Sequence, residues 1–163
     1  MCYSAQVEES FKRYVKQFGA DIDIHQFVKL YGHRAEGMPL RIPKAMDANF
    51  AEAGTADERA IAAMIADFDG AELFKQRKRL ADAERSLQAR VTKAASESRR
   101  IARNKVKWLL ARIADIKRRE LLPRDSRIFP GHYAPVLLIE DGRRVVKPMR
   151  YQCRPPGRPA YYD

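Results

Sequence analysis

Cysteine is scarce in this chain of 163 residues, which has two, Cys2 and Cys153, one near each end. So few thiols exclude a disulfide framework, and the lack of a recognisable export signal favours a reducing cytoplasm as the location. The two cysteines and the three histidines, His25, His33 and His132, show no spacing typical of a metal site. We therefore expect neither a metal nor another cofactor.

Long hydrophobic runs are also missing. No apolar stretch approaches the roughly 18 residues of a membrane-spanning helix, so we expect no membrane partner. With 45% hydrophobic and 33% charged residues, the composition is that of a globular protein rather than a disordered one. The length suits one domain, 1–163, able to bury a single core.

Glycine and proline are absent from Ala71 to Leu122, and this stretch, the basic arm, also carries the positive charge. Between Lys75 and Arg119 there are 16 Lys or Arg and four Asp or Glu, a net charge of +12, whereas the rest of the chain sums to −1. Polyanions are therefore the natural partners of the arm.

The apolar residues of the basic arm recur at helical spacing. They predict a long helix, or a helical hairpin bent near residues 92–98. Leucines seven residues apart leave a coiled-coil dimer open beside an intramolecular hairpin. Trp108 is expected to pack rather than to stack on a base. The stripe is Ala102, Val106, Leu109, Ile113 and Ile116, and the leucines are Leu73, Leu80 and Leu87.

Shorter helices are expected before the arm. Apolar spacing predicts one from Phe11 that stops at Gly19, and another within residues 22–37. Thr55 starts a third, over residues 55–68, with acidic residues in its first turn. Prolines at 39 and 43 indicate a loop or extended link between the second and the third.

After Pro123 the pattern changes to that of β-strands. Two apolar, β-rich runs, APVLLIE and VVKPMRYQ, flank an Asp-Gly pair, which is a strong hairpin signal. A lone hairpin is marginal in water. We expect its unpaired strand edges, or the basic arm, to promote self-association.

The two ends of the chain together resemble the SOS-response-associated peptidase family, whose SRAP fold shields abasic sites in single-stranded DNA. The residues that carry the resemblance are MCYSAQ at the start and RIFPGHYAPVLLIEDGRRVVKPMRYQCRPPG from Arg127. Pro130 and Gly131 match the family's turn before a hairpin. Met149, Arg150, Tyr151 and Pro155 fall on its Met-Arg-Trp-Gly-Leu-Ile-Pro-like motif.

The resemblance implies an α+β fold: an SRAP-like hairpin and sheet portion with a large helical insertion, residues 20–122. It also implies DNA contacts by Arg150, Tyr151 and the Pro130-Gly131 turn, with packing of Tyr151 in the sheet as the alternative. Single-stranded DNA with abasic sites is the implied partner.

The chain departs from the family pattern at several positions. Tyr151 replaces a tryptophan, Gln152 a glycine and Arg154 an apolar residue, while Tyr3 and Ser4 stand where many members have Gly-Arg. The family's Asn-Ala-Arg motif, glutamate and histidine follow the hairpin and have no counterpart before Asp163. We therefore expect an N-terminal part or a shortened member of the family.

Cys2 is the expected catalytic residue. Removal of Met1 would leave a terminal 1,2-aminothiol, with an amine of pKa about 7.7–8.0 and a thiol of about 8.5. Such a pair condenses with the aldehyde of an open abasic site to a thiazolidine. The resemblance adds autopeptidase and lyase chemistry to this covalent capture in the DNA-damage response. Cys153 is expected to be a small buried hydrophobe.

A second hypothesis needs no enzyme. A chance Cys2 at a frayed end would leave a basic helical nucleic-acid-binding or coiled-coil interaction protein. The mature N-terminus distinguishes the two, since retention of Met1 removes the aminothiol.

Overall fold

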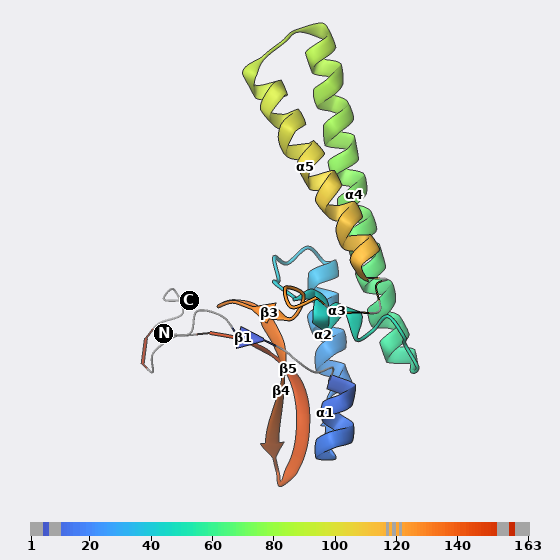
Figure 1. The fold of residues 1–163 in the computed structure, drawn as a ribbon, viewed down its shortest axis with the longest axis vertical. Helices are drawn as coiled ribbons and strands as arrows, with labels where there is room; N and C mark the ends of the chain where they lie inside the picture. Colours follow the sequence, from blue (N-terminus) through green and yellow to red (C-terminus); the bar gives the residue numbers. More distant parts are fainter. Residues whose placement is uncertain are drawn as a thin grey trace. The chain divides into compact units, whose positions relative to one another are not determined.

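The computed structural model describes residues 5–6, 11–116, 118, 120, 122–152 and 157–158, with Phe11 and Tyr14 described by their backbone alone. The fold is mixed α+β (Figure 1), with five helices and five strands among these residues. Contacts divide the chain into two compact units. We call Met1–Ile65 with Arg119–Asp163 the sheet unit and Ala66–Arg118 the helical unit, and describe each by itself.

The first two helices of the sheet unit follow the predicted spacing. Helix α1 (Phe11–Phe18) is followed by Gly19, whose φ of +58° suits a glycine and turns the chain. Helix α2 (Ile24–Ala35) begins after Asp23, whose carboxylate accepts a hydrogen bond from the backbone N–H of Gln26. Both predictions are confirmed.

Aromatic rings form the core of the sheet unit. Phe50 meets Phe27 and Tyr31 of α2 edge-on, with ring centroids 5.9 and 5.3 Å apart. All three rings are buried, and full burial of such a side chain stabilises a fold by about 1.5–3 kcal/mol. Beside them Arg34 Nη1 lies 3.0 Å from Asp47 Oδ1 in a buried ion pair.

The stretch between α2 and the next long helix is not entirely a loop. Pro43 precedes a short helix, α3 (Lys44–Ala48), because the fixed φ of proline and its missing N–H suit a helix start. Lys44 Nζ lies 3.1 Å from Asp125 Oδ2, and Ala45 N–H donates to the Asp125 carbonyl. Helix α3 is thereby joined to the segment that leads into the hairpin.

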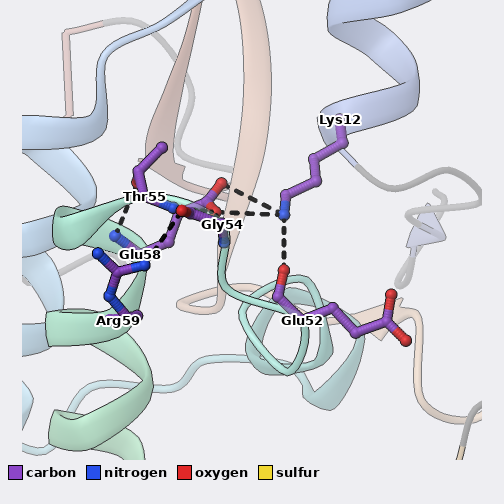
Figure 2. Close-up of polar contacts among 6 residues, drawn as sticks. All are labelled: Lys12, Glu52, Gly54, Thr55, Glu58 and Arg59. Atoms are coloured by element: carbon purple, nitrogen blue, oxygen red, sulfur yellow. Dashed lines mark hydrogen bonds and ion pairs between the residues drawn. The ribbon is translucent and has the colours of Figure 1, made fainter.

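Helix α4 (Ala56–Ala89) begins with a capping box (Figure 2). The hydroxyl of Thr55 accepts from Glu58 N–H at 3.2 Å, and Glu58 Oε2 accepts from the N–H of Gly54 at 2.7 Å and of Thr55 at 3.3 Å. Lys12 of α1 reaches the same carboxylate at 3.3 Å and the carbonyl of Glu52 at 3.1 Å. The predicted start at Thr55 is confirmed, and α1 is tied to it.

The main sheet has the order β2-β5-β4. Strands β4 (Tyr133–Glu140) and β5 (Arg143–Arg150) form the predicted antiparallel hairpin, and β2 (Asp21–Ile22) pairs parallel with β5. The turn residues Asp141 and Gly142 have φ of +49° and +76°, both positive as a type I′ turn requires.

Strand β5 therefore has a partner on each side. On the outer edge of β4, the described residues form an isolated bridge between Arg41 and His132. Since β2 belongs to the sheet and residues 20–65 to the sheet unit, the segment 20–122 is divided between the two units. It is not one separate helical body.

A second, smaller sheet joins the N-terminal segment to the segment that precedes β4. Strand β1 (Ala5–Gln6) pairs antiparallel with β3 (Arg127–Ile128), with Ala5 opposite Ile128. Gln6 also donates from its side-chain amide to the carbonyl of Pro123 at 3.3 Å.

The helical unit is an intramolecular hairpin made of residues 66–89 of α4 and helix α5 (Lys93–Ile116) (Figure 1). The antiparallel arrangement follows from two contacts: Arg112 with Asp69 at 3.0 Å and Arg79 with Ser98 at 3.1 Å. Thr92 accepts a hydrogen bond from Ala95 N–H at the start of α5. Its buried residues are Asp69, Gln76, Ala83, Ala102 and Leu109.

Candidate functional site

The Pro130-Gly131 turn is bonded to the end of β5. Gly131 N–H donates to the carbonyl of Tyr151 at 2.7 Å, and Tyr151 N–H donates to the carbonyl of His132 at 2.7 Å. Gly131 has a φ of +88°, which a residue with a side chain adopts only at a cost. The turn and the Arg150-Tyr151 strand end thus form one fixed piece of backbone.

The N-terminal strand lies against this piece. Ile128 of β3 and Ala134 of β4 form a small buried cluster, and Ala5 of β1 and Tyr151 pack against it. Tyr151 is half-buried there. Its ring takes part in packing at the site, and the remaining exposed part is what a ligand could touch.

Arg150 is exposed and lies over the turn. It stands opposite Tyr133 in the β4–β5 ladder, and its Nη2 would be 3.8 Å from a Cβ built on Gly131. A Cβ at Gly131 would therefore only touch the guanidinium at van der Waals distance, and the cost of a side chain there would come from the backbone conformation.

Two further arginines adjoin the turn, and neither was singled out from the sequence. Arg127 lies in β3, and the carbonyl of Arg41 accepts the N–H of Tyr133 at 2.9 Å. Like Arg150, both are exposed, and none of the three forms an ion pair with a carboxylate in the described part of the chain. Three exposed arginines therefore lie on the segments that meet at the turn, and guanidinium groups are well suited to bind phosphate.

His132 and Phe129 complete the turn. The imidazole Nδ1 of His132 lies 3.0 Å from the Phe129 carbonyl, and the two rings are 5.7 Å apart. Phe129 is exposed. The turn thus offers an aromatic ring and an imidazole beside three cations, the residue types found on surfaces that bind single strands.

We call this surface the turn site; it comprises Arg41, Arg127, Phe129, Pro130, Gly131, His132, Arg150 and Tyr151. The structure brings together four of the predicted site residues, namely Pro130, Gly131, Arg150 and Tyr151. Cys2, Tyr3, Ser4, Cys153, Arg154 and Pro155 lie outside the described residues. Arg41 has no local sequence signal, because it reaches the site through a bridge to a residue far along the chain.

No grouping of three or more His, Cys, Asp or Glu suited to a metal ion occurs among the described residues. None of their helices is both long and apolar enough to cross a membrane. No protein-family model, curated protein or solved structure matches the chain.

Proposed function

We propose that this chain is an SRAP-type protein that covalently captures abasic sites in single-stranded DNA through Cys2, with associated autopeptidase activity, in the DNA-damage response. The β1–β3 pairing is the observation that carries the proposal. It attaches the N-terminal segment beside the turn and the strand end, so the two distant stretches that carry the family resemblance meet at one site.

The pairing of β1 with β3 also limits where Cys2 can lie, because Cys2 is joined to β1 by a short stretch of chain. Three residues span at most about 11 Å, and Ala5 lies three residues after Cys2. Since Ala5 packs on the same cluster as Tyr151, the reach of the Cys2 thiol includes the surroundings of the turn. An N-terminal strand paired elsewhere would carry no such implication.

The proposed reaction has two bond-forming steps. The α-amine freed by loss of Met1 attacks the sugar aldehyde, and water leaves to give an imine. The thiol then adds to the imine carbon, its sulfur forming a C–S bond while its proton passes to the nitrogen. The product is a five-membered thiazolidine, which ties the protein to the DNA without a cofactor.

Arg41, Arg127 and Arg150 would hold the phosphates that flank the abasic sugar. Guanidinium groups bind phosphate oxygens through paired, charge-assisted hydrogen bonds, and three exposed ones can fix the strand's path. Phosphate contacts position a strand but do not read its sequence, as capture at any sequence requires.

The decisive test uses single-stranded DNA with one abasic site and the full chain. Wild type and Cys153→Ala should form a heat-stable adduct on denaturing gels, whereas Cys2→Ala should form none. Cys2→Ala and Cys2→Ser both keep the α-amine but lack the thiol, so each should give only a labile imine, which borohydride converts to a stable secondary amine. Intact mass should show that Met1 has been removed. Equal adducts from wild type and Cys2→Ala would refute the mechanism.

A second experiment tests the site. Arg150→Gln should slow capture at low DNA concentration by roughly 5- to 10-fold, because a lost phosphate contact weakens binding. Arg143→Gln is the matched control, since Arg143 is an exposed arginine at the far end of the same strand. If both variants slowed capture equally, the effect would come from net charge and not from the turn site.

A further inference from the structure

Trp108 is unexpectedly exposed. Sequence spacing favours packing for this residue, the single tryptophan of the chain, yet 57% of its surface is open to solvent. In contrast Leu109, the next residue of α5, is buried. A large ring outside the hairpin core contributes little to folding, and its exposure indicates a role in binding.

Cations stand one turn before and one turn after the ring. Lys105 Nζ is 5.7 Å and the Arg112 guanidinium carbon 5.9 Å from its centroid, both within the range of cation–π contact. Arg112 is held by buried Asp69 at 3.0 Å, which fixes its place beside the ring. Lys105 forms no ion pair with a carboxylate in the described chain and is exposed.

A shallow depression begins at Trp108 and continues along α5. Its first part is lined by Trp108, Lys105, Asn104, Ile101 and Arg100. An adjoining part shares Arg100 and Asn104 and adds residues back to Lys93, namely Ser96, Glu97, Arg99 and Arg103. From Lys93 to Trp108 the helix rises about 22 Å, a length along which a nucleic acid strand passes several phosphates.

The charge of this surface is strongly one-sided. Helix α5 carries seven Lys or Arg against two Asp or Glu. One of the two acids, Glu97, is already paired with Arg100. A protein partner for this face would have to be acidic, whereas a nucleic acid supplies both phosphates for the cations and flat bases for the indole.

We infer that the Lys93–Trp108 face of α5 binds single-stranded nucleic acid, with an unpaired base stacked on Trp108 and phosphates on the basic residues. Stacking accepts any base, and the cations beside the ring meet the backbone on either side of it. Duplex DNA offers the same phosphates but no free base face, so the preference for single strands is the mark of this site.

Intrinsic fluorescence tests the inference, because Trp108 is the only emitter of its kind. Undamaged oligothymidylate and oligouridylate should quench it in the full-length protein, while a duplex of equal charge should quench it much less. A preference between the two oligomers identifies DNA or RNA as the source of the strand. Absence of quenching by either would overturn the inference.

Variants give the second readout, the anisotropy of a labelled oligothymidylate. Trp108→Ala should weaken binding by roughly 5- to 150-fold, as loss of one base stack does. Leu110→Ala, an exposed apolar change on the same helix outside the depression, should leave it unchanged. Lys105→Gln should weaken it more than Lys78→Gln, an equal change of charge on α4. If the two variants of either pair weakened binding equally, the proposed site would be refuted.

This inference is independent of the proposed function. The oligomers contain no abasic aldehyde, so Cys2 has no part in the measurement. Trp108→Ala should still form the Cys2-dependent adduct at saturating abasic DNA, and Cys2→Ala should still show quenching.

Discussion

Glu58 is held in its charged form by its neighbours. Burial acts to raise the pKa of this carboxyl, but the N–H groups of Gly54 and Thr55 and the ammonium of Lys12 together outweigh burial and lower it. The same contacts close the start of α4 and tie α1 to it (Figure 2). One side chain therefore links a helix cap to the packing of a neighbouring helix.

We predict that Glu58→Gln lowers the free energy of unfolding by about 1–2 kcal/mol at neutral pH, because it loses the ion pair and weakens the cap. A lowered folded-state pKa stabilises the fold above the ordinary value of about 4.3, and this contribution disappears as the pH falls through the folded pKa. The gap between wild type and variant should therefore close in acid. Urea titrations across pH measure it.

Asp57→Asn is the control for Glu58→Gln. Asp57 lies in the same first turn of α4 but makes none of the contacts of the capping box drawn in Figure 2. Its loss should cost a few tenths of a kcal/mol from the helix dipole alone. A cost as large as that of Glu58→Gln would assign the effect to the dipole and not to the cap.

At the scale of elements, we predict opposite changes in stability when alanine replaces each of two glycines. Gly142 sits in the hairpin turn with a φ of +76°, so Gly142→Ala should destabilise the protein by about 1 kcal/mol. Gly32 lies within α2, and a Cβ there would meet nothing within 4 Å, so Gly32→Ala should stabilise by about 0.4–1 kcal/mol. Thermal unfolding of both variants checks the signs; a stabilising Gly142→Ala would contradict the type I′ turn.

Elements with local signals were predictable from the sequence. The hairpin follows from Asp141-Gly142 between apolar runs, α4 starts at Thr55, and Leu109 is buried in the predicted stripe of α5. Each depends on residues within a few positions of one another. The third helix was expected to end at Phe68, but α4 continues past Gly70, because one glycine costs only about 1 kcal/mol in a helix.

Elements that depend on distant partners were not predictable. Strand β2 has two residues and exists because β5 pairs with it, and Arg41 reaches the turn site through a similar bridge. The residues around Asp21 and around Arg41 do not have a composition typical of a strand. The exposure of Trp108 was missed for a different reason, since helical spacing does not reveal which flank of a stripe the partner helix covers.

At the scale of the whole molecule, the two units should respond separately to mutation. Ala102 is fully buried in the helical unit, so Ala102→Leu should overpack it at a cost of about 1–3 kcal/mol. Hydrogen exchange should accelerate in peptides of 66–118 and stay unchanged in β4 and β5. Ala111→Leu, an exposed site on α5, should change neither. Uniform acceleration would show that the units unfold together.

The long-range pairing of β1 with β3 and of β2 with β5 also sets the order of events on the ribosome. Ala5 can pair only after Ile128 has been synthesised, and Asp21 only after Val145; these partners come 123 and 124 residues later. At about 5–20 residues per second, this delay lasts roughly 6–25 s. The helical hairpin needs no residue beyond Arg118 and can form within that time. A nascent chain that has emerged up to Arg118 would already hold the Trp108 face, while the strands around the turn site would still be missing their partners.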